Sequence, residues 1–169
     1  MLIYDPFFGK FITGCIRQIT DTVPTAGVML YRKHVALLVN PRFFMEGLKN
    51  RAERAGVLKH EALHIMLKHV ITMRRSEITD KRLYNIAADL EVNQYIGSPW
   101  ALPDGAILLS TFPDIDLPPN DTAETYYNIL LQAQKEGKKS LQQFSNEQHA
   151  GQGHSDHRGW GGPESEDDS

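Results

Sequence analysis

His60 and His64 stand four residues apart in the segment His60-Glu61-Ala62-Leu63-His64, a pattern that can hold a metal ion and activate water. Side chains four residues apart lie on one face of an α-helix, with Cβ atoms roughly 5–6 Å apart, so both imidazoles can bind one cation. Glu61 can take a proton from zinc-bound water as general base. The spacing therefore predicts zinc-dependent hydrolysis of peptide bonds. The alternative is an incidental histidine pair on a solvated helix face.

A catalytic zinc ion usually has three protein ligands and one open position, so a third ligand is needed. Asp89 is the predicted ligand, because Asn85, Asp89 and Asn93 recur every four residues along one face of a second predicted helix. Asn85 and Asn93 are candidate auxiliary residues. Glu91 competes as a ligand, but it lies about 200° around that helix from Asp89, so the two readings demand different rotations. Alternatively, Asp89 pairs with a Lys or Arg at the surface.

His69 is not expected to bind the same ion. In a continuous helix it would lie about 180° around the axis from His60 and about 140° from His64. The metzincin class is excluded as well. Its motif would require Gly and His where this sequence has Leu67 and Val70.

Composition limits the class of protein. The chain has 169 residues, 41% of them hydrophobic, which is typical of one globular domain. With Cys15 as its single cysteine, neither a disulfide framework nor a multi-thiolate zinc site can form. No secretory leader pattern and no apolar run of about 18 residues is present, so we predict a cytoplasmic protein without a membrane partner. No basic stripe marks the sequence, so nucleic acid is not an expected partner and a DNA-associated protease is disfavoured.

The spacing of apolar residues predicts an α+β, mainly helical fold. Helices are expected over residues 5–19, 50–74, 79 or 80 to 97, and 121 or 122 to 137, and a short helix is expected to start at Pro41. A β-hairpin is expected over 27–31 and 34–39, and an extended excursion over 98–119, with 106–109 as an edge strand. The polar, acidic composition beyond Ser140 predicts a folded domain over 1–139 and a largely disordered tail over 140–169.

The motif from His60 to His64 with His69, followed by Asn85-Ile86-Ala87-Ala88-Asp89 and Asn93, resembles the metallopeptidase domain found in bacteria and phages beside von Willebrand factor A-like domains. Residues 5–9 (Asp-Pro-Phe-Phe-Gly) and 122–127 (Thr-Ala-Glu-Thr-Tyr-Tyr) are similar to that family's flanking segments. The resemblance covers most of residues 5–160.

This resemblance implies a zincin-like fold with a central HExxH helix, a second ligand-bearing helix and a small β-hairpin or sheet. It implies His60, His64 and Asp89 as Zn²⁺ ligands, Glu61 as general base, and a protein or peptide substrate. It also implies partnership with an AAA+ ATPase or a separate von Willebrand factor A-like protein.

The end of the sequence carries a further similarity. Residues 156–160 (Asp-His-Arg-Gly-Trp) resemble the family's Asp-His-x-x-Trp segment, but the von Willebrand factor A-like domain that usually follows is absent from this sequence. His154, Asp156 and His157 either fold back onto the metal or extend within the tail. The candidates for stabilising an oxyanion are Tyr126, Tyr127, Arg74, Arg75 and His157, of which Tyr126 and His157 are counted as auxiliary site residues.

A non-catalytic function is the main alternative to hydrolysis. The domain would then be a zinc-stabilised protein-interaction module, in which the metal joins two helices. Structural zinc sites have four protein ligands, so a fourth side chain such as His157 or Asp156 would distinguish this module from an enzyme.

Overall fold

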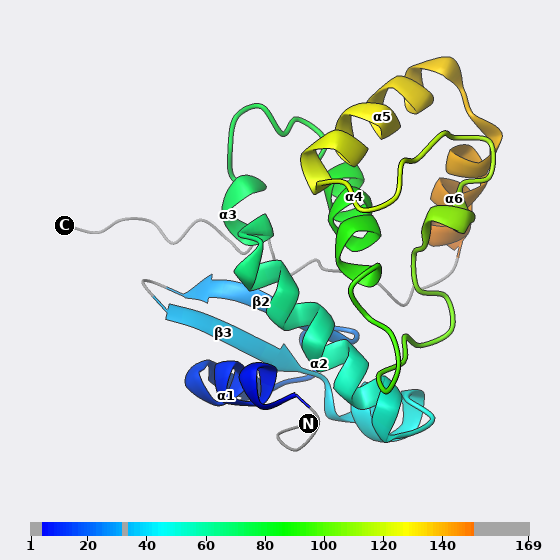
Figure 1. The fold of residues 1–169 in the computed structure, drawn as a ribbon. Coiled ribbons are helices and arrows are strands. Elements are labelled where there is room, and N and C mark those ends of the chain that lie inside the picture. The colour runs from blue at the N-terminus through cyan, green and yellow to red at the C-terminus, as the bar shows by residue number, and fades with distance from the viewer. Residues whose placement is uncertain (1–4, 32–33, 151–169) are drawn as a thin grey trace.

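The computed structural model describes residues 5–31 and 34–150 (Figure 1). Its elements are, in chain order, α1 (Pro6–Gly14), β1 (Ile16–Ile19), β2 (Ala26–Tyr31), β3 (His34–Val39), the π-helical turn η1 (Phe43–Gly47), α2 (Arg51–Met66), α3 (His69–Thr72), α4 (Lys81–Asn93), the 3₁₀ turn η2 (Leu109–Thr111), α5 (Ala123–Glu136) and α6 (Lys139–Ala150). The fold is mainly helical α+β, as predicted. No helix in these described ranges has the length and apolar character needed to cross a bilayer.

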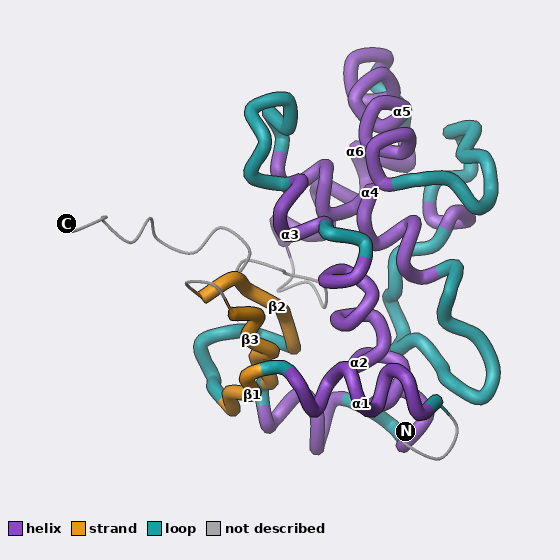
Figure 2. The backbone as a smooth tube through the Cα atoms, turned by 60° about the vertical axis from the view of Figure 1, so that its left-hand side comes forward, coloured by secondary structure: helices purple, strands orange, loops and turns teal. Residues whose placement is uncertain are grey.

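The three strands form one small sheet in the order β1-β3-β2. β2 and β3 are antiparallel neighbours, which confirms the predicted hairpin, and β1 runs parallel to β3. The successive residues Ala36, Leu37 and Leu38 are all buried. Because neighbouring side chains on a strand point to opposite faces, the central strand is covered on both sides. Figure 2 shows the strands gathered at one end of the molecule and α4, α5 and α6 at the other.

The helix predicted over residues 5–19 is too long. α1 begins at Pro6 and ends at Gly14, after which Cys15 is extended (φ −81°, ψ 151°). Residues Ile16–Ile19 instead pair with β3 as strand β1, and all four side chains are exposed. The three-residue spacing of Ile16 and Ile19 therefore does not mark a buried helix face. Backbone pairing with a distant strand decides this segment, and local spacing does not reveal it.

α2 is the central helix and carries the HExxH motif. At its start, the Asn50 side chain accepts a hydrogen bond from the Glu53 backbone N–H (3.0 Å), and the Glu53 carboxylate accepts one from the Lys49 N–H (2.8 Å). This arrangement is related to a capping box and satisfies two backbone donors. α2 lies against β2, α1 and α4, so it connects the sheet with the helical part of the fold (Figure 1).

The single helix predicted over residues 50–74 is divided in two. Lys68 adopts the left-handed conformation (φ 62°, ψ 22°) and separates α2 from α3. That conformation costs a non-glycine residue about 1–2 kcal/mol. The turn buries Val70 and Met73, which are 5% and 3% exposed, and burying such side chains contributes about 1.5–3 kcal/mol each. Core burial therefore offsets the strained residue.

α4 and α5 pack against each other and form the centre of the main core. α4 begins after Asp80, whose carboxylate accepts a hydrogen bond from Leu83 N–H (2.9 Å), and it ends at Asn93, earlier than the predicted Gly97. α5 follows Thr122 as N-cap and ends at Gly137 in the left-handed conformation (φ 69°), as predicted. The residues of this pair that are fully buried are Tyr84, Ala87, Ala88, Leu90, Val92, Ala123, Tyr126 and Leu130.

The segment after α4 contains no strand at residues 106–109, contrary to the prediction. The Ile107 carbonyl accepts a hydrogen bond from the Asn93 side chain (2.8 Å) rather than from a strand. The same segment packs directly on α2, where Ala101 N–H donates to the Ala52 carbonyl (3.2 Å). A Cβ atom at Gly56 would lie 1.9 Å from the Ala101 carbonyl oxygen. Only glycine at position 56 permits this close contact.

The folded chain extends past the predicted boundary at residue 139. Residues 140–150, expected to begin a disordered tail, belong to α6 (Lys139–Ala150). Leu141 is 3% exposed, and Phe144 packs against the main core with its ring 5.4 Å from that of Phe112. These two apolar residues hold α6 on the domain. The predicted tail from residue 151 onward lies outside the described residues.

Candidate metal centre

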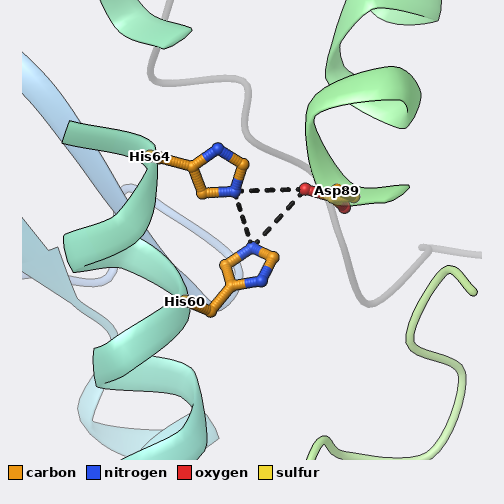
Figure 3. Close-up of side chains that lie close together, drawn as sticks. All are labelled: His60, His64 and Asp89. Carbon is orange, nitrogen blue, oxygen red and sulfur yellow. Dashed lines mark hydrogen bonds and ion pairs between the residues drawn. The ribbon is translucent and has the colours of Figure 1, made fainter. Parts of the chain in front are cut away.

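Three predicted ligand side chains converge on one point between α2 and α4 (Figure 3). His60 Nε2 lies 2.9 Å from His64 Nε2 and 3.5 Å from Asp89 Oδ1. His64 Nε2 lies 3.2 Å from the same Asp89 oxygen. The four-residue spacing on α2 aligns the two imidazoles, and the packing of α4 against α2 supplies the carboxylate.

The cluster is buried but borders a pocket. The side chains of His64 and Asp89 are 0% and 3% exposed, and that of His60 is 13% exposed. His60 and Asp89 line a pocket whose wall also includes Asn93 and the segment 102–107. One side of the cluster can therefore be reached by a small molecule or a side chain.

The orientation of His60 follows from Asn93, one helical turn after Asp89. Asn93 Nδ2 donates to the Ile107 carbonyl (2.8 Å), so its Oδ1 faces His60 Nδ1 (2.8 Å) as an acceptor. His60 Nδ1 must then carry the proton. In neutral His60, Nε2 consequently presents a lone pair toward Asp89 and His64.

This donor set fits a small divalent cation. A tetrahedral zinc ion with bonds of roughly 2.0–2.1 Å separates its donor atoms by roughly 3.3 Å, and the three observed separations lie on both sides of that value. Two imidazoles and a carboxylate are ligands typical of zinc and neighbouring transition metals. A carboxylate oxygen facing an imidazole lone pair at 3.5 Å is repulsive unless a positive charge lies between them.

Glu61 lies next to the cluster. Its side chain is 2% exposed, and it lines the same pocket as His60 and Asp89. The Glu61 carboxylate is therefore buried at the wall of the pocket that the cluster borders.

A family model described as "Putative metallopeptidase domain" matches residues 1–168. The chain belongs to this family. No curated protein and no solved structure gave a match. Membership of the metallopeptidase domain family and the convergent cluster of two histidines and one aspartate together support a metal-dependent peptidase as the broad functional class.

In this metallopeptidase domain, His69 lies outside the three-residue cluster, but not on the far side of the helix as expected. The break at Lys68 brings His69 Nδ1 to 3.0 Å from His64 Nδ1. Because α2 and α3 are separate helices, His69 is not turned away from His64 as it would be in a continuous helix. His69 is buried (2% exposed), and its ring lies beside that of Tyr84. Burial raises the pKa of the Tyr84 hydroxyl above its ordinary value.

Glu91, the competing ligand, also lies outside the cluster. Its Oε2 is 3.1 Å from His69 Nε2 and accepts a hydrogen bond from the backbone N–H of Ala123 (2.6 Å). Of the two rotations of α4 considered from the sequence, the structure adopts the one that directs Asp89 toward the histidines. Glu91 therefore faces a histidine, but the histidine is His69 of α3 and not one of the two predicted ligands on α2.

The auxiliary candidates divide into several groups. Asn93 contacts His60, whereas Asn85 is half-buried and its Oδ1 makes no hydrogen bond. The Tyr126 hydroxyl donates to the Pro118 carbonyl (2.6 Å), so it holds the loop before α5. His157 lies outside the described residues, as do His154 and Asp156.

The remaining described candidates for an oxyanion donor do not line the pocket beside the cluster. The Tyr127 hydroxyl accepts a hydrogen bond from Asp80 N–H (3.0 Å), at the start of α4. Arg74 and Arg75 are exposed after α3. The geometry therefore identifies no oxyanion donor among the candidates that the structure describes.

Proposed function

We propose that this metallopeptidase domain hydrolyses peptide bonds with a zinc ion bound by His60, His64 and Asp89. The observation that carries the proposal is the convergence of these three side chains beside the pocket that Glu61 lines. The separations of the three donor atoms, from 2.9 to 3.5 Å, support zinc.

Glu61 is the proposed general base and acid. Bound zinc would supply Lewis-acid activation of water and of the scissile carbonyl. The Glu61 carboxylate would take a proton from the attacking water and then deliver it to the leaving amine nitrogen. Its burial beside the cluster supports this role, because a general base must lie within hydrogen-bonding reach of the proton that it removes.

The pocket supports a preference for apolar side chains next to the cleaved bond. Its wall beyond the polar cluster is formed mainly by Phe43, Val57, Leu102, Pro103 and Ile107. An apolar pocket discriminates between side chains through the area that they bury. We therefore propose a peptide or protein substrate with an apolar residue seated in this pocket.

The number of described ligand side chains favours hydrolysis over the non-catalytic module. Within residues 5–31 and 34–150, the cluster offers three ligand side chains. Catalytic zinc sites usually combine three protein ligands with one exchangeable position, whereas structural sites are closed by four.

The test combines metal analysis with a cleavage assay. Purified protein should contain about one zinc per chain, the ratio expected for one three-ligand site. A mixture of peptides, analysed by mass spectrometry, should be cleaved beside apolar residues. Glu61→Gln keeps the shape of the side chain but cannot act as a base, so it should retain zinc and lose at least about 100-fold of the cleavage rate.

Glu77→Gln is the matched control, since it makes the same chemical change at an exposed position. It should retain both zinc and activity. If Glu61→Gln binds zinc and cleaves peptides as fast as the unmodified protein, Glu61 is not the general base. If the unmodified protein binds zinc but cleaves no peptide, the interaction module becomes the better description.

A further inference from the structure

A buried row of hydrogen-bonding groups connects the cluster with the start of α5. His64 Nδ1 faces His69 Nδ1 at 3.0 Å, and His69 Nε2 faces Glu91 Oε2 at 3.1 Å. The same Glu91 oxygen accepts from the backbone N–H of Ala123 at 2.6 Å. All four residues are 7% exposed or less. Four elements thus contribute to one row: α2, α3, α4 and α5.

The chemistry of the row determines where its protons lie. A carboxylate only accepts hydrogen bonds, so a neutral His69 next to Glu91 must carry its proton on Nε2. His69 Nδ1 is then an acceptor, and the facing His64 Nδ1 must donate to it. A neutral imidazole has one N–H, so His64 Nε2 presents its lone pair to His60 and Asp89.

We propose that Glu91 and His69 are positioning residues that hold His64 in the tautomer required for metal binding. This inference rests on the proposed function, because it concerns the same zinc site. Glu91 acts through His69 and touches neither the metal nor the substrate. His60 is held in the matching tautomer by Asn93, so both histidines of α2 present Nε2 as a ligand atom.

The fold places Glu91 where its negative charge is stabilised. Ala123 is the first residue of α5, a 14-residue helix, and the N-terminus of a helix favours an anion. The left-handed Lys68 separates α2 from α3, and His69 lies between His64 and Glu91. Without this break, His69 would lie about 140° around the helix from His64. The division of the helix therefore has a direct consequence at the metal site.

The first measurement needs no variant. In metal-free protein labelled with ¹⁵N, the chemical shifts of the ring nitrogens report the tautomer of each histidine. His64 should carry its proton on Nδ1 and His69 on Nε2. A proton on His64 Nε2, or a doubly protonated His69, would overturn the proposal.

The second measurement is zinc affinity, determined by competition with a chelator. Replacing an outer partner of a ligand histidine typically weakens metal binding about 10–100-fold, and His69→Phe should fall in this range. Glu91→Gln keeps the side-chain volume, but its amide can also donate to His69 Nε2. It should therefore shift part of His64 to the Nε2–H tautomer and weaken zinc binding. His34→Phe and Glu77→Gln make the same changes at exposed positions and should leave affinity unchanged.

The outcomes separate this inference from the proposed function. If the unmodified protein binds no zinc, the proposed function fails, whereas the tautomers of the metal-free protein still decide the roles of His69 and Glu91. If zinc binds but Glu91→Gln changes neither the His64 tautomer nor the affinity, the positioning role is wrong. If His69→Phe does not fold, Glu91→Gln and the unmodified protein carry the test.

Discussion

His60 Nδ1 lies 2.8 Å from Asn93 Oδ1, and Asn93 stands one turn of α4 after Asp89. The same face of α4 thus provides a carboxylate for the cluster and an amide that orients one of its histidines. Second partners of this kind fix the tautomer and the ring plane of a ligand histidine. Two adjacent turns of α4 therefore contribute a ligand side chain, Asp89, and a side chain that orients a ligand, Asn93.

Replacing Asn93 should weaken metal binding without removing a ligand. Asn93→Ala removes the acceptor for His60 and the donor to the Ile107 carbonyl, so zinc affinity should fall about 10–100-fold. Competition with a chelator measures the change. Asn128→Ala, at an exposed position of α5, is the control and should leave affinity unaltered. Equal affinities for the two variants would show that Asn93 does not orient His60.

Zinc should stabilise the fold through Asp89. A ligand at 100 times its dissociation constant stabilises the folded state by about 2.7 kcal/mol, so chelation should lower the melting temperature measurably. Asp89→Asn keeps the size of the side chain but removes the charge, and its melting temperature should not respond to zinc. Calorimetry with and without zinc makes the comparison. A full zinc response in Asp89→Asn would exclude Asp89 as a ligand.

Gly56 should tolerate no larger residue. In Gly56→Ala, the new methyl group would meet the Ala101 carbonyl oxygen at 1.9 Å. The loop must move away, and overpacking of this kind costs about 1–3 kcal/mol. Denaturant unfolding measures the loss. Gly97→Ala is the matched control, because no atom lies within 4 Å of its added Cβ. Equal free energies of unfolding for the two variants would show that the segment around Ala101 can move away without loss of stability.

Asp114 should make the attachment of α6 sensitive to acid. Its carboxylate accepts hydrogen bonds from the Ser140 hydroxyl and from the backbone N–H groups of Lys139 and Ser140. The Ser140 side chain, followed by these backbone donors, lowers the pKa of Asp114 below its ordinary 3.8. The unfolded state therefore binds the proton first, and the stabilisation is present above the ordinary pKa and is lost as the pH falls through the lowered value.

Hydrogen exchange of the α6 amides can follow this loss. Exchange, corrected for its intrinsic pH dependence, should accelerate in acid in the unmodified protein. In Asp114→Asn, the protection should already be lower at neutral pH and should change less. Asp116→Asn, at a nearby exposed position, should behave like the unmodified protein. If the α6 amides are protected equally in Asp114→Asn and in the unmodified protein, Asp114 does not cap α6.

The parts of the site that follow helical spacing could be predicted from the sequence. His60 and His64 are related by four residues on α2, and Asp89 belongs to the four-residue stripe with Asn93. Both patterns depend only on helical spacing, so these side chains share a helix face whatever the tertiary structure is. The helices α4 and α5 were predicted for the same reason, since their caps, Asp80, Thr122 and Gly137, are local signals.

The interactions that depend on tertiary structure could not be predicted in this way. A lysine in the left-handed conformation at position 68 has no sequence signal, so the contact between His64 and His69 was missed. Strand β1 exists because β3 lies beside it. For α6 a signal was present, because Leu141 and Phe144 have helical spacing, but the polar composition around them concealed it.

The Asn93 amide binds the His60 ring on one side and the Ile107 carbonyl, in the pocket wall, on the other. Segment 98–107 also contacts α2, because the Ala101 N–H donates a hydrogen bond to the Ala52 carbonyl. The pocket wall at Ile107 and the imidazole ring of His60 are thus connected through one side chain, that of Asn93. A substrate side chain that displaces Ile107 would strain the Asn93 hydrogen bonds or tilt the His60 ring. Substrate fit and metal-site geometry should therefore change together.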